Sequence, residues 1–378
     1  MKKALILANS SGGLYDFRNE ILTRLMGEGF EVVVSVPDDV RTKEIIDEGC
    51  RVIKTEINRR GVNPIQDLKL LKQYKKILKV EKPDVVLTYT IKPNVYGGLA
   101  CRLKKVPYFA TITGLGSTFE KEGILKKIVV TLYKIGLKGS ECVFFQNSEN
   151  MMIFEKLGIT HGNNKLVPGS GVDLERHKFV PKEYDTSKEG STELAIGNEN
   201  FCMKFLYVGR LMEEKGILEY LEAAKNVKKE YRDKVKCMAI GYFDDGVKDA
   251  VMKAVEEKYF EVLPFDPDIN KYMEMADCIV MPSYHEGMSN VLLEAAATGR
   301  PCLASNISGC REIVDNEITG YLFRAKDAKS LENAMNRFMR LSNKQRMRMG
   351  ERARKKVERE FDRKIVIDSY MEEIEKIM

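Results

Sequence analysis

Short apolar runs rich in β-branched residues alternate along this chain with longer stretches of helical periodicity. A first series of runs predicts strands at 4–9, 31–36, 52–55, 84–89, 108–113 and 142–147. A second series predicts strands at 204–209, 235–241, 259–264, 277–282, 301–305 and 321–323. Strands that alternate with helices are typical of a parallel sheet covered on both faces. The pattern therefore predicts an α/β protein with two doubly wound domains.

The boundary between these domains is set by the gap between the two series. A polar, turn-rich stretch at 181–200 predicts an exposed loop shortly after the linker. We expect an N-terminal domain over 1–172 and a C-terminal domain over 173–361. From about 327 onward the pattern is helical, and we expect a last helix at 362–378 that packs back on the first domain.

The composition of the chain limits the kinds of catalytic site and the cellular compartment that we expect. The chain has three histidines, which argues against a histidine-rich metal site. Its eight cysteines show no C-x-x-C spacing, as expected for reduced core residues of a cytoplasmic protein. No apolar stretch approaches the 18 or so residues of a membrane span, and the apolar run at the N-terminus is too short for a secretory signal.

The net charge of +6 is unevenly distributed. Residues 1–173 carry 27 lysines and arginines against 19 aspartates and glutamates, whereas residues 174–378 carry 35 against 37. A solvated surface explains such an excess, and so does contact with anionic lipid or phosphorylated substrates. Nothing in the pattern indicates a nucleic-acid partner.

Candidate chemistry lies in loops that follow strands, where open α/β sheets bind ligands. In the first domain, Gly12 and Gly13 follow the first strand and precede a helix that we expect to begin near Phe17. Small residues there would let a phosphate or sugar approach a helix N-terminus, and a plain tight turn is an equal alternative. The loop is not a full G-x-G-x-x-G, so a dinucleotide cofactor is not expected.

The second domain offers a stronger candidate. Its first strand ends in a glycine-flanked loop that carries Arg210 and Lys215, two cations that could bind a diphosphate. After the strand at 277–282, Ser289 is a candidate N-cap for a helix, whose N-terminus would attract phosphate. Glu286 and Glu294 flank that N-terminus and could bind the hydroxyls of a sugar and a ribose. The expected donor contacts also include Gly287, Met288, Asn290 and Val291.

A D-x-D sequence at Asp266 and Asp268 resembles a metal-binding motif of other sugar transferases. Asp268 precedes a helical pattern, so an N-cap is the favoured role. We therefore expect no metal site and no cofactor.

These motifs together resemble family 4 retaining glycosyltransferases. The resemblance includes Gly209-Arg210-x4-Lys215-Gly216 and Glu286-Gly287-x6-Glu294, and it runs over essentially the whole chain. It implies the GT-B fold, two Rossmann-like domains that face a cleft. It also implies that Arg210 and Lys215 neutralise the donor diphosphate, that Glu294 binds the nucleotide ribose and that Glu286 contacts the transferred sugar.

Motifs in the first half resemble bacterial enzymes that extend lipid-linked sugars. They imply an acceptor site that includes Tyr15, Arg18, Lys92, Asn94, Thr113, Gly114 and Ser117. Many family members have a histidine after the strand that here ends near Thr113, and this chain has none there. A histidine contact to the transferred sugar is therefore not expected.

Residues 118–140 predict an amphipathic helix with basic residues around an apolar face. The basic residues are Lys126, Lys127, Lys134 and Lys138. Such a helix suits an anionic membrane surface beside the acceptor site, and a helix that packs on the core has the same pattern.

We therefore expect a retaining, metal-independent transferase. It would move a hexose or N-acetylhexosamine from a nucleotide diphosphate sugar, UDP-linked, to a polyprenyl-diphosphate-linked saccharide at the inner face of the cytoplasmic membrane. Two alternatives stay open: an epimerase that acts on UDP-N-acetylhexosamine, and a non-catalytic nucleotide-sugar-binding scaffold of a membrane assembly complex.

Overall fold

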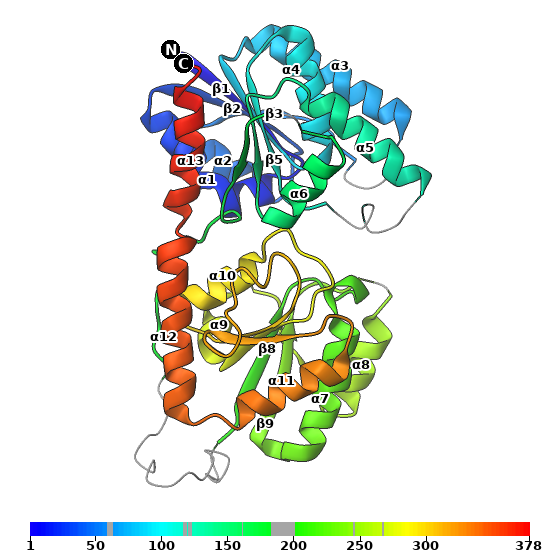
Figure 1. Cartoon of the computed structure of the whole chain (residues 1–378), viewed down its shortest axis with the longest axis vertical. Coiled ribbons are helices and arrows are strands. Elements are labelled where there is room, and N and C mark those ends of the chain that lie inside the picture. The colour runs from blue at the N-terminus through cyan, green and yellow to red at the C-terminus, as the bar shows by residue number, and fades with distance from the viewer. Residues whose placement is uncertain are drawn as a thin grey trace. The chain divides into compact units, whose positions relative to one another are not determined.

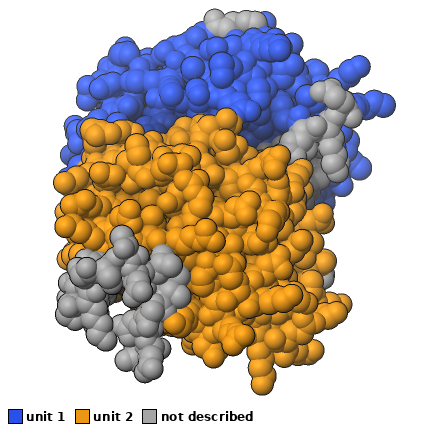
Figure 2. Space-filling view, turned by 60° about the horizontal axis from the view of Figure 1, so that its bottom comes forward, with its two compact units in different colours: residues 1–171, 364–378 blue, residues 172–363 orange. Residues whose placement is uncertain are grey.

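The computed structural model describes residues 1–58, 63–115, 119, 123–160, 162–182, 201–244, 246–266 and 268–378. The chain forms two compact units, coloured blue and orange in Figure 2. Unit 1 comprises residues 1–171 and 364–378, and unit 2 comprises residues 172–363. The chain thus leaves unit 1 once and returns to it with its last helix.

Unit 1 contains a sheet of seven parallel strands in the order β3-β2-β1-β4-β5-β6-β7. The strands are β1 (Lys2–Leu7), β2 (Phe30–Val36), β3 (Arg51–Lys54), β4 (Val85–Tyr89), β5 (Tyr108–Ile112), β6 (Cys142–Phe145) and β7 (Asn164–Leu166). The sequence pattern predicts the first six of these. It misses β7, because this short edge strand has no apolar run.

Helices cover both faces of this sheet (Figure 1). They are α1 (Ser11–Gly27), α2 (Thr42–Asp47), α3 (Pro64–Glu81), α4 (Gly98–Lys104), α5 (Ile124–Leu137), α6 (Ser148–Lys156) and α13 (Arg363–Glu375). In Figure 1 the red helix α13 lies beside the blue helix α1, and both share one apolar core with the sheet. Helices α3 and α4 pack on the opposite face.

Unit 2 contains six parallel strands in the order β10-β9-β8-β11-β12-β13. The strands are β8 (Met203–Val208), β9 (Val235–Ile240), β10 (Glu261–Val262), β11 (Cys278–Met281), β12 (Cys302–Ser305) and β13 (Gly320–Phe323), each at a predicted position. The helices are α7 (Ile217–Tyr231), α8 (Lys248–Glu256), α9 (Asn270–Met275), α10 (Asn290–Ala297), α11 (Ala328–Met339) and α12 (Asn343–Glu360). Helices α7, α8 and α11 share one core with the sheet, and α9, α10 and α12 share the other.

Both sheets have a point where the strand order reverses. It lies between β1 and β4 in unit 1 and between β8 and β11 in unit 2. In doubly wound sheets, ligands bind at the carboxyl ends of the two strands that flank this switch point. The loops that follow β1, β4, β8 and β11 are therefore the places where the fold positions a site.

Candidate active site

The switch point of unit 2 brings together the two loops that carry the predicted donor residues. Strands β8 and β11 pair directly, and the backbone N–H of Tyr284 donates to the carbonyl of Glu214 at 3.0 Å. The loop after β8 is thus joined to the loop after β11 by main-chain bonding.

Gly216 allows this close approach. Its φ of 71° lies in the left-handed region, and an added Cβ would stand 2.0 Å from the carbonyl oxygen of Pro282. Any side chain here would separate the two loops. The glycine that flanks the cationic loop is therefore a packing requirement of the site.

Lys215 and Glu286 form an ion pair across these loops. Lys215 ends a short 3₁₀ turn, Glu213–Lys215, and its Nζ lies 2.5 Å from Oε1 of Glu286. Their side chains keep 25% and 15% of their surface exposed, so the pair is only partly shielded from water. The structure thus juxtaposes a cation and a carboxylate that are 71 residues apart in the chain.

Arg210 lies on the same loop and is exposed. Its carbonyl accepts a hydrogen bond of 2.5 Å from the hydroxyl of Tyr207, a buried residue of β8. Burial, and secondarily the charge of Glu286, raises the pKa of Tyr207, so this hydroxyl remains a donor. The loop backbone is therefore fixed while the guanidinium faces solvent.

Helix α10 begins beside this pair, as predicted. Ser289 is its N-cap and accepts from the N–H of Leu292, and the N–H of Ser289 donates to the carbonyl of Gly309. Met288 and Ser289 are buried, whereas Gly287, Asn290, Val291 and Glu294 are half-buried. The N-terminus of a helix carries partial positive charge, so α10 adds to the cationic character of this edge.

The carboxylates of the D-x-D sequence bond to neighbouring residues of the chain. Asp266 accepts from the amide of Asp268 and pairs with Lys271, and Asp268 accepts from the amide of Asn270 at 3.2 Å. Asp268 therefore bonds the first residue of α9, although the cap position itself is Ile269. Across the described ranges, no group of three or more His, Cys, Asp or Glu side chains could hold a metal ion.

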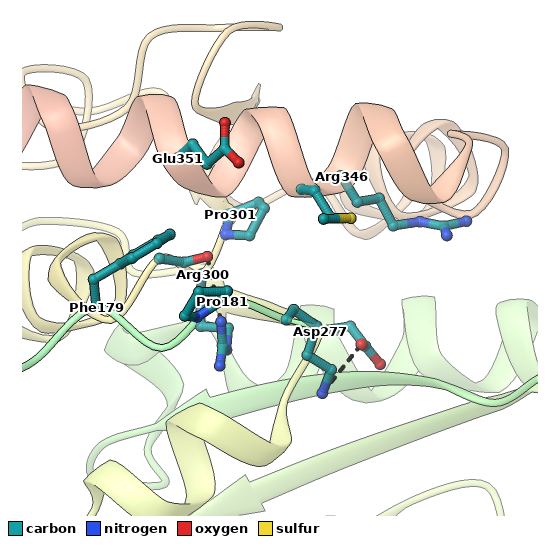
Figure 3. Close-up of a pocket in the computed structure, with 10 residues that line it drawn as sticks. Phe179, Pro181, Asp277, Arg300, Pro301, Arg346 and Glu351 are labelled. Atoms are coloured by element: carbon teal, nitrogen blue, oxygen red, sulfur yellow. Dashed lines mark hydrogen bonds and ion pairs between the residues drawn. The ribbon is translucent and has the colours of Figure 1, made fainter. Parts of the chain in front are cut away.

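A separate small pocket in unit 2 lies at the opposite edge of its sheet (Figure 3). It is lined by residues that precede β11 and β12, including Asp277 and Pro301. Asp277 pairs with Lys182, whose Nζ also donates to the carbonyl of Met275. The nearby Arg300 is buried and donates to the carbonyl of Val180. These cations bond the segment at 180–182 to the rest of unit 2, and the pocket lies away from the loops that follow β8 and β11.

At the switch point of unit 1, the helix after β1 begins earlier than predicted, and its N-terminus bonds to a carboxylate of the chain. Helix α1 begins at Ser11, six residues before the expected Phe17, because Ser10 caps it by accepting from the amide of Gly13. The amide of Ser11 donates to Asp39 at 2.9 Å. An internal carboxylate thus occupies the helix N-terminus where Gly12 and Gly13 were expected to admit a phosphate. The added Cβ of a residue at position 12 would stand 3.0 Å from a methyl group of the exposed Val40, so the space at this position is tight.

Asn94 cannot contact an acceptor in this structure. It is fully buried, accepts from the hydroxyl of Thr88 at 2.7 Å and donates to the carbonyl of Thr111 at 2.8 Å. These bonds join the positions after β4 to β5, so the role is structural. Lys92 is paired with the buried Asp67 at 2.7 Å, which also leaves it poorly placed for a ligand.

The remaining acceptor candidates lie near the carboxyl ends of the strands. Tyr15 and Arg18 are half-buried on α1, and Thr113 and Gly114 are half-buried after β5. Ser117 lies outside the described residues.

Helix α5 presents two faces. Val129, Tyr133 and Leu137 are buried against the core, whereas Ile124, Leu125, Ile128 and Ile135 are exposed. Lys127, Lys134 and Lys138 are exposed beside them, and Lys126 is half-buried. The apolar residues expected on one face are therefore divided between the core and the surface. Within the described ranges, no helix is both long and apolar enough to cross a membrane.

The sequence analysis missed two aromatic residues beside the candidate site. Tyr242 and Phe265 follow β9 and β10 and keep 61% and 51% of their surface exposed. Their ring centroids lie 4.4 Å apart, and the ring planes are inclined at 34°. The carbonyl of Tyr242 accepts from the amide of Leu211, which follows Arg210. Exposed aromatic residues directly after predicted strands were the signal that could have found them.

Two family models match the two halves of the chain. The one described as Glycosyl transferase 4-like matches residues 3–147, and the one described as Glycosyl transferases group 1 matches residues 200–356. Anabaena HepE, solved in complex with UDP and glucose, has a TM-score of 0.78 with 18% identity, and the match covers 100% of both chains. The protein is thus a glycosyltransferase of the GT-B fold.

The chain is also similar in sequence to glycosyltransferases of known activity. It is 28% identical to N,N'-diacetylbacillosaminyl-diphospho-undecaprenol alpha-1,3-N-acetylgalactosaminyltransferase of Campylobacter jejuni, over 98% of each chain. It is 29% identical to UDP-Gal:alpha-D-GlcNAc-diphosphoundecaprenol alpha-1,3-galactosyltransferase of Escherichia coli, over 82% of this chain and 80% of that one. The chain belongs to the family 4 retaining glycosyltransferases.

Proposed function

We propose that this enzyme transfers a hexose or N-acetylhexosamine from a UDP-sugar to a saccharide linked to polyprenyl diphosphate, in the synthesis of a cell-surface glycan. The names of the Campylobacter and Escherichia relatives describe transfer to undecaprenol-diphosphate-linked sugars, and HepE binds UDP and glucose. These likenesses support the class of donor and acceptor.

The observation that carries the proposal is the presence of two cationic residues, Arg210 and Lys215, at the switch point of unit 2. In the transfer, the bond between C1 of the sugar and the donor diphosphate breaks, and a bond forms between C1 and an acceptor hydroxyl oxygen. Negative charge develops on the departing diphosphate, and Arg210, Lys215 and the N-terminus of α10 stabilise it. The departing phosphate oxygen takes the proton of the acceptor hydroxyl, on the same face of the sugar, so the configuration is retained. This scheme requires no metal ion or cofactor, because protein groups supply the positive charge.

Glu286 has two effects in this scheme. Before the donor binds, its carboxylate holds Lys215 in place at 2.5 Å. An ammonium group has three N–H donors, so Lys215 can retain this bond and also donate to a phosphate oxygen. In this proposal Glu286 accepts a hydrogen bond from a hydroxyl of the transferred sugar, and Glu294 accepts one from the ribose.

Tyr242 and Phe265 offer a surface for the nucleobase. Their neighbouring rings follow β9 and β10, the two strands beyond β8, on the side of the cationic loop away from β11. A flat base gains stacking energy of about 1–3 kcal/mol on such rings, judged by alanine substitution in other base-binding proteins. Replacing Phe265 by alanine should therefore raise the KM for the donor by about tenfold or more with little change in kcat, as measured by initial rates at saturating acceptor.

The exposed side of α5 suits the membrane that holds the acceptor. Ile124, Leu125, Ile128 and Ile135 form an apolar stripe with exposed lysines beside it, which is the arrangement of helices that lie on anionic lipid. Ile128→Asp should weaken co-sedimentation with phosphatidylglycerol vesicles. The control is Met252→Asp, which alters an exposed apolar residue of α8 in unit 2 and should leave binding unchanged. Equal binding by all three proteins would contradict a membrane role for α5.

One assay separates the three functions. The protein is incubated with labelled UDP-sugars and with short-chain polyprenyl-diphosphate-linked saccharides in detergent. We expect label to move to the lipid-linked product. Isomerisation of the free UDP-sugar would indicate the epimerase, and binding without turnover would indicate the scaffold.

A further inference from the structure

We propose that the C-terminal helix α13 completes the acceptor site of unit 1, with Tyr370 as a positioning residue for Arg18. Arg18 would bind an acceptor phosphate group. This inference rests on the proposed function, because it assigns a place for the diphosphate of the acceptor.

Tyr370 packs against three residues that lie side by side on neighbouring strands of the unit 1 sheet. Tyr89 of β4 is the register partner of Thr111 of β5, and Thr111 is the register partner of Phe144 of β6. Tyr89 is the last residue of its strand and Thr111 the last but one. The row therefore crosses the carboxyl end of the sheet, where doubly wound proteins bind ligands.

Tyr370 contacts every member of this row. Its hydroxyl lies 2.6 Å from the hydroxyl of Thr111, and its ring centroid lies 4.1 Å from that of Phe144 and 6.2 Å from that of Tyr89. All four residues are buried, and 259 residues of chain separate Tyr370 from Thr111. A phenylalanine would fill the same space, so packing alone does not require the two hydroxyls. Their hydrogen bond fixes the position of the hydroxyl end of Tyr370 and thus helps to set the surface against which Tyr89 rests.

Arg18 also contacts the ring of Tyr89. Its guanidinium carbon stands 4.8 Å from the centroid of the Tyr89 ring, and Nη1 donates to the carbonyl of Gly13 at 3.2 Å. Arg18 belongs to α1, the helix that follows β1, whereas Tyr89 ends β4. The contact therefore spans the strands that flank the switch point of unit 1, where ligands are expected.

The chemistry of Arg18 identifies the ligand as an anion with phosphate geometry. A guanidinium is planar, permanently charged and suited to bidentate contact with phosphate. The ring of Tyr89 contacts the guanidinium through a cation–π interaction and so helps to hold it in place. The nearby amide of Ser11 is bound to Asp39, so it does not offer an alternative anion site.

The first test separates the acceptor from the donor. Tyr370→Phe and Thr111→Val each remove one hydroxyl of the pair, and we expect each to raise the KM for the acceptor about threefold to tenfold, the size of one net hydrogen bond. The KM for the donor should stay within about twofold, because the change acts only on the acceptor, which is the ligand assigned to Arg18. The double variant should be no worse than either single variant, since both break one bond.

A matched control comes from another buried tyrosine of unit 1. Tyr108 begins β5, and its hydroxyl donates to the carbonyl of Gly136 at 2.8 Å. Tyr108→Phe also removes a buried hydrogen bond, but at the amino end of the sheet, so it should leave both KM values unchanged. If Tyr370→Phe behaves like Tyr108→Phe, or shifts the donor and acceptor KM equally, Tyr370 is only structural and the inference is overturned.

The second test addresses Arg18 itself. Arg18→Lys keeps the charge but loses the planar fork, and we expect the KM for a diphosphate-linked acceptor to rise about tenfold or more. The assay uses a short-chain acceptor in detergent and, separately, anionic vesicles without acceptor. Loss of vesicle binding alone would assign Arg18 to the lipid surface and overturn its role in acceptor binding. If the wild-type enzyme transfers no sugar to any such acceptor, the proposed function fails instead.

Discussion

The two units share the order of their first six strands, but their switch points differ in charge. In unit 2 the loops after β8 and β11 meet through Gly216, and they place an exposed Arg210 and the Lys215–Glu286 pair at the edge of the sheet. In unit 1 the helix after β1 has a carboxylate, Asp39, bonded to its first amide. The switch point of unit 2 therefore carries cations at its surface, whereas the N-terminus of α1 at the switch point of unit 1 is already neutralised by an internal carboxylate.

This difference shows that the doubly wound fold fixes where a ligand can bind, and the loop residues decide which ligand. Both units have a helix N-terminus at the switch point, which by itself attracts anions. A single aspartate from the loop after β2 removes that property from α1. The anion contact that we propose for unit 1 consequently uses a side chain, Arg18, and not helix amides.

The largest effect should come from Lys215. Lys215→Ala removes a cation that we propose stabilises the leaving diphosphate, and we expect sugar transfer to fall about 10²–10³-fold, or about 3–4 kcal/mol of transition-state stabilisation. The control Lys225→Ala removes an exposed lysine of α7 that pairs with Glu257 and should leave transfer unchanged. Full activity of Lys215→Ala at saturating donor would contradict the proposal that the loops after β8 and β11 stabilise the leaving diphosphate.

Asn94 tests the claim that this part of unit 1 is structural. Asn94→Ala leaves the carbonyl of Thr111 without the Asn94 donor, while the hydroxyl of Thr88 keeps the carbonyl of Phe109 as an acceptor at 3.2 Å. With the lost hydrogen bonds and packing of the buried amide, we expect a loss of about 2–3 kcal/mol in the free energy of unfolding. Urea denaturation measures the loss. If instead stability is unchanged and the KM for the acceptor rises, Asn94 contacts substrate and the interpretation is wrong.

A substitution at Glu286 distinguishes effects on donor binding from effects on sugar transfer in unit 2. Glu286→Gln removes a negative charge beside the diphosphate position and releases Lys215 from its ion pair, so UDP should bind several-fold more tightly. Transfer should nevertheless fall about tenfold, because a neutral amide holds the sugar and Lys215 less firmly. Calorimetry with UDP and initial rates give the two values. Weaker UDP binding would show that Glu286 supports the diphosphate contact and does not compete with it.

The smallest effect should come from Asp39. Asp39→Asn removes the carboxylate from the N-terminus of α1, and we expect a loss of about 1–2 kcal/mol in the free energy of unfolding, without a change in the KM for the donor. Asp38→Asn is the matched control, because Asp38 is an exposed neighbour that pairs only with the exposed Lys54 among the described residues. Such a surface pair contributes about 0–1 kcal/mol. Equal losses for the two variants would remove the contrast between the units.

Much of the fold follows from local sequence. The runs of β-branched residues predicted twelve strands, because a buried parallel strand needs a continuous apolar segment. The polar segment of β7 gave no such signal. The cap of α10 was also predictable, since Ser289 bonds an amide only three residues away. The start of α1 was missed, although its cap is equally local, because glycines after Ser10 resemble a loop.

The sequence by itself determined the two series of strands, the loops that carry the chemistry and the positions of Arg210 and Lys215. Only the tertiary structure decided which partners these loops meet. It placed Asp39 on α1, buried Asn94 between strands, paired Lys215 with a glutamate 71 residues away and brought Tyr370 to Thr111 across 259 residues. Periodicity and capping depend on neighbours within a few residues, whereas these contacts depend on strand order and on which face of the sheet each helix covers.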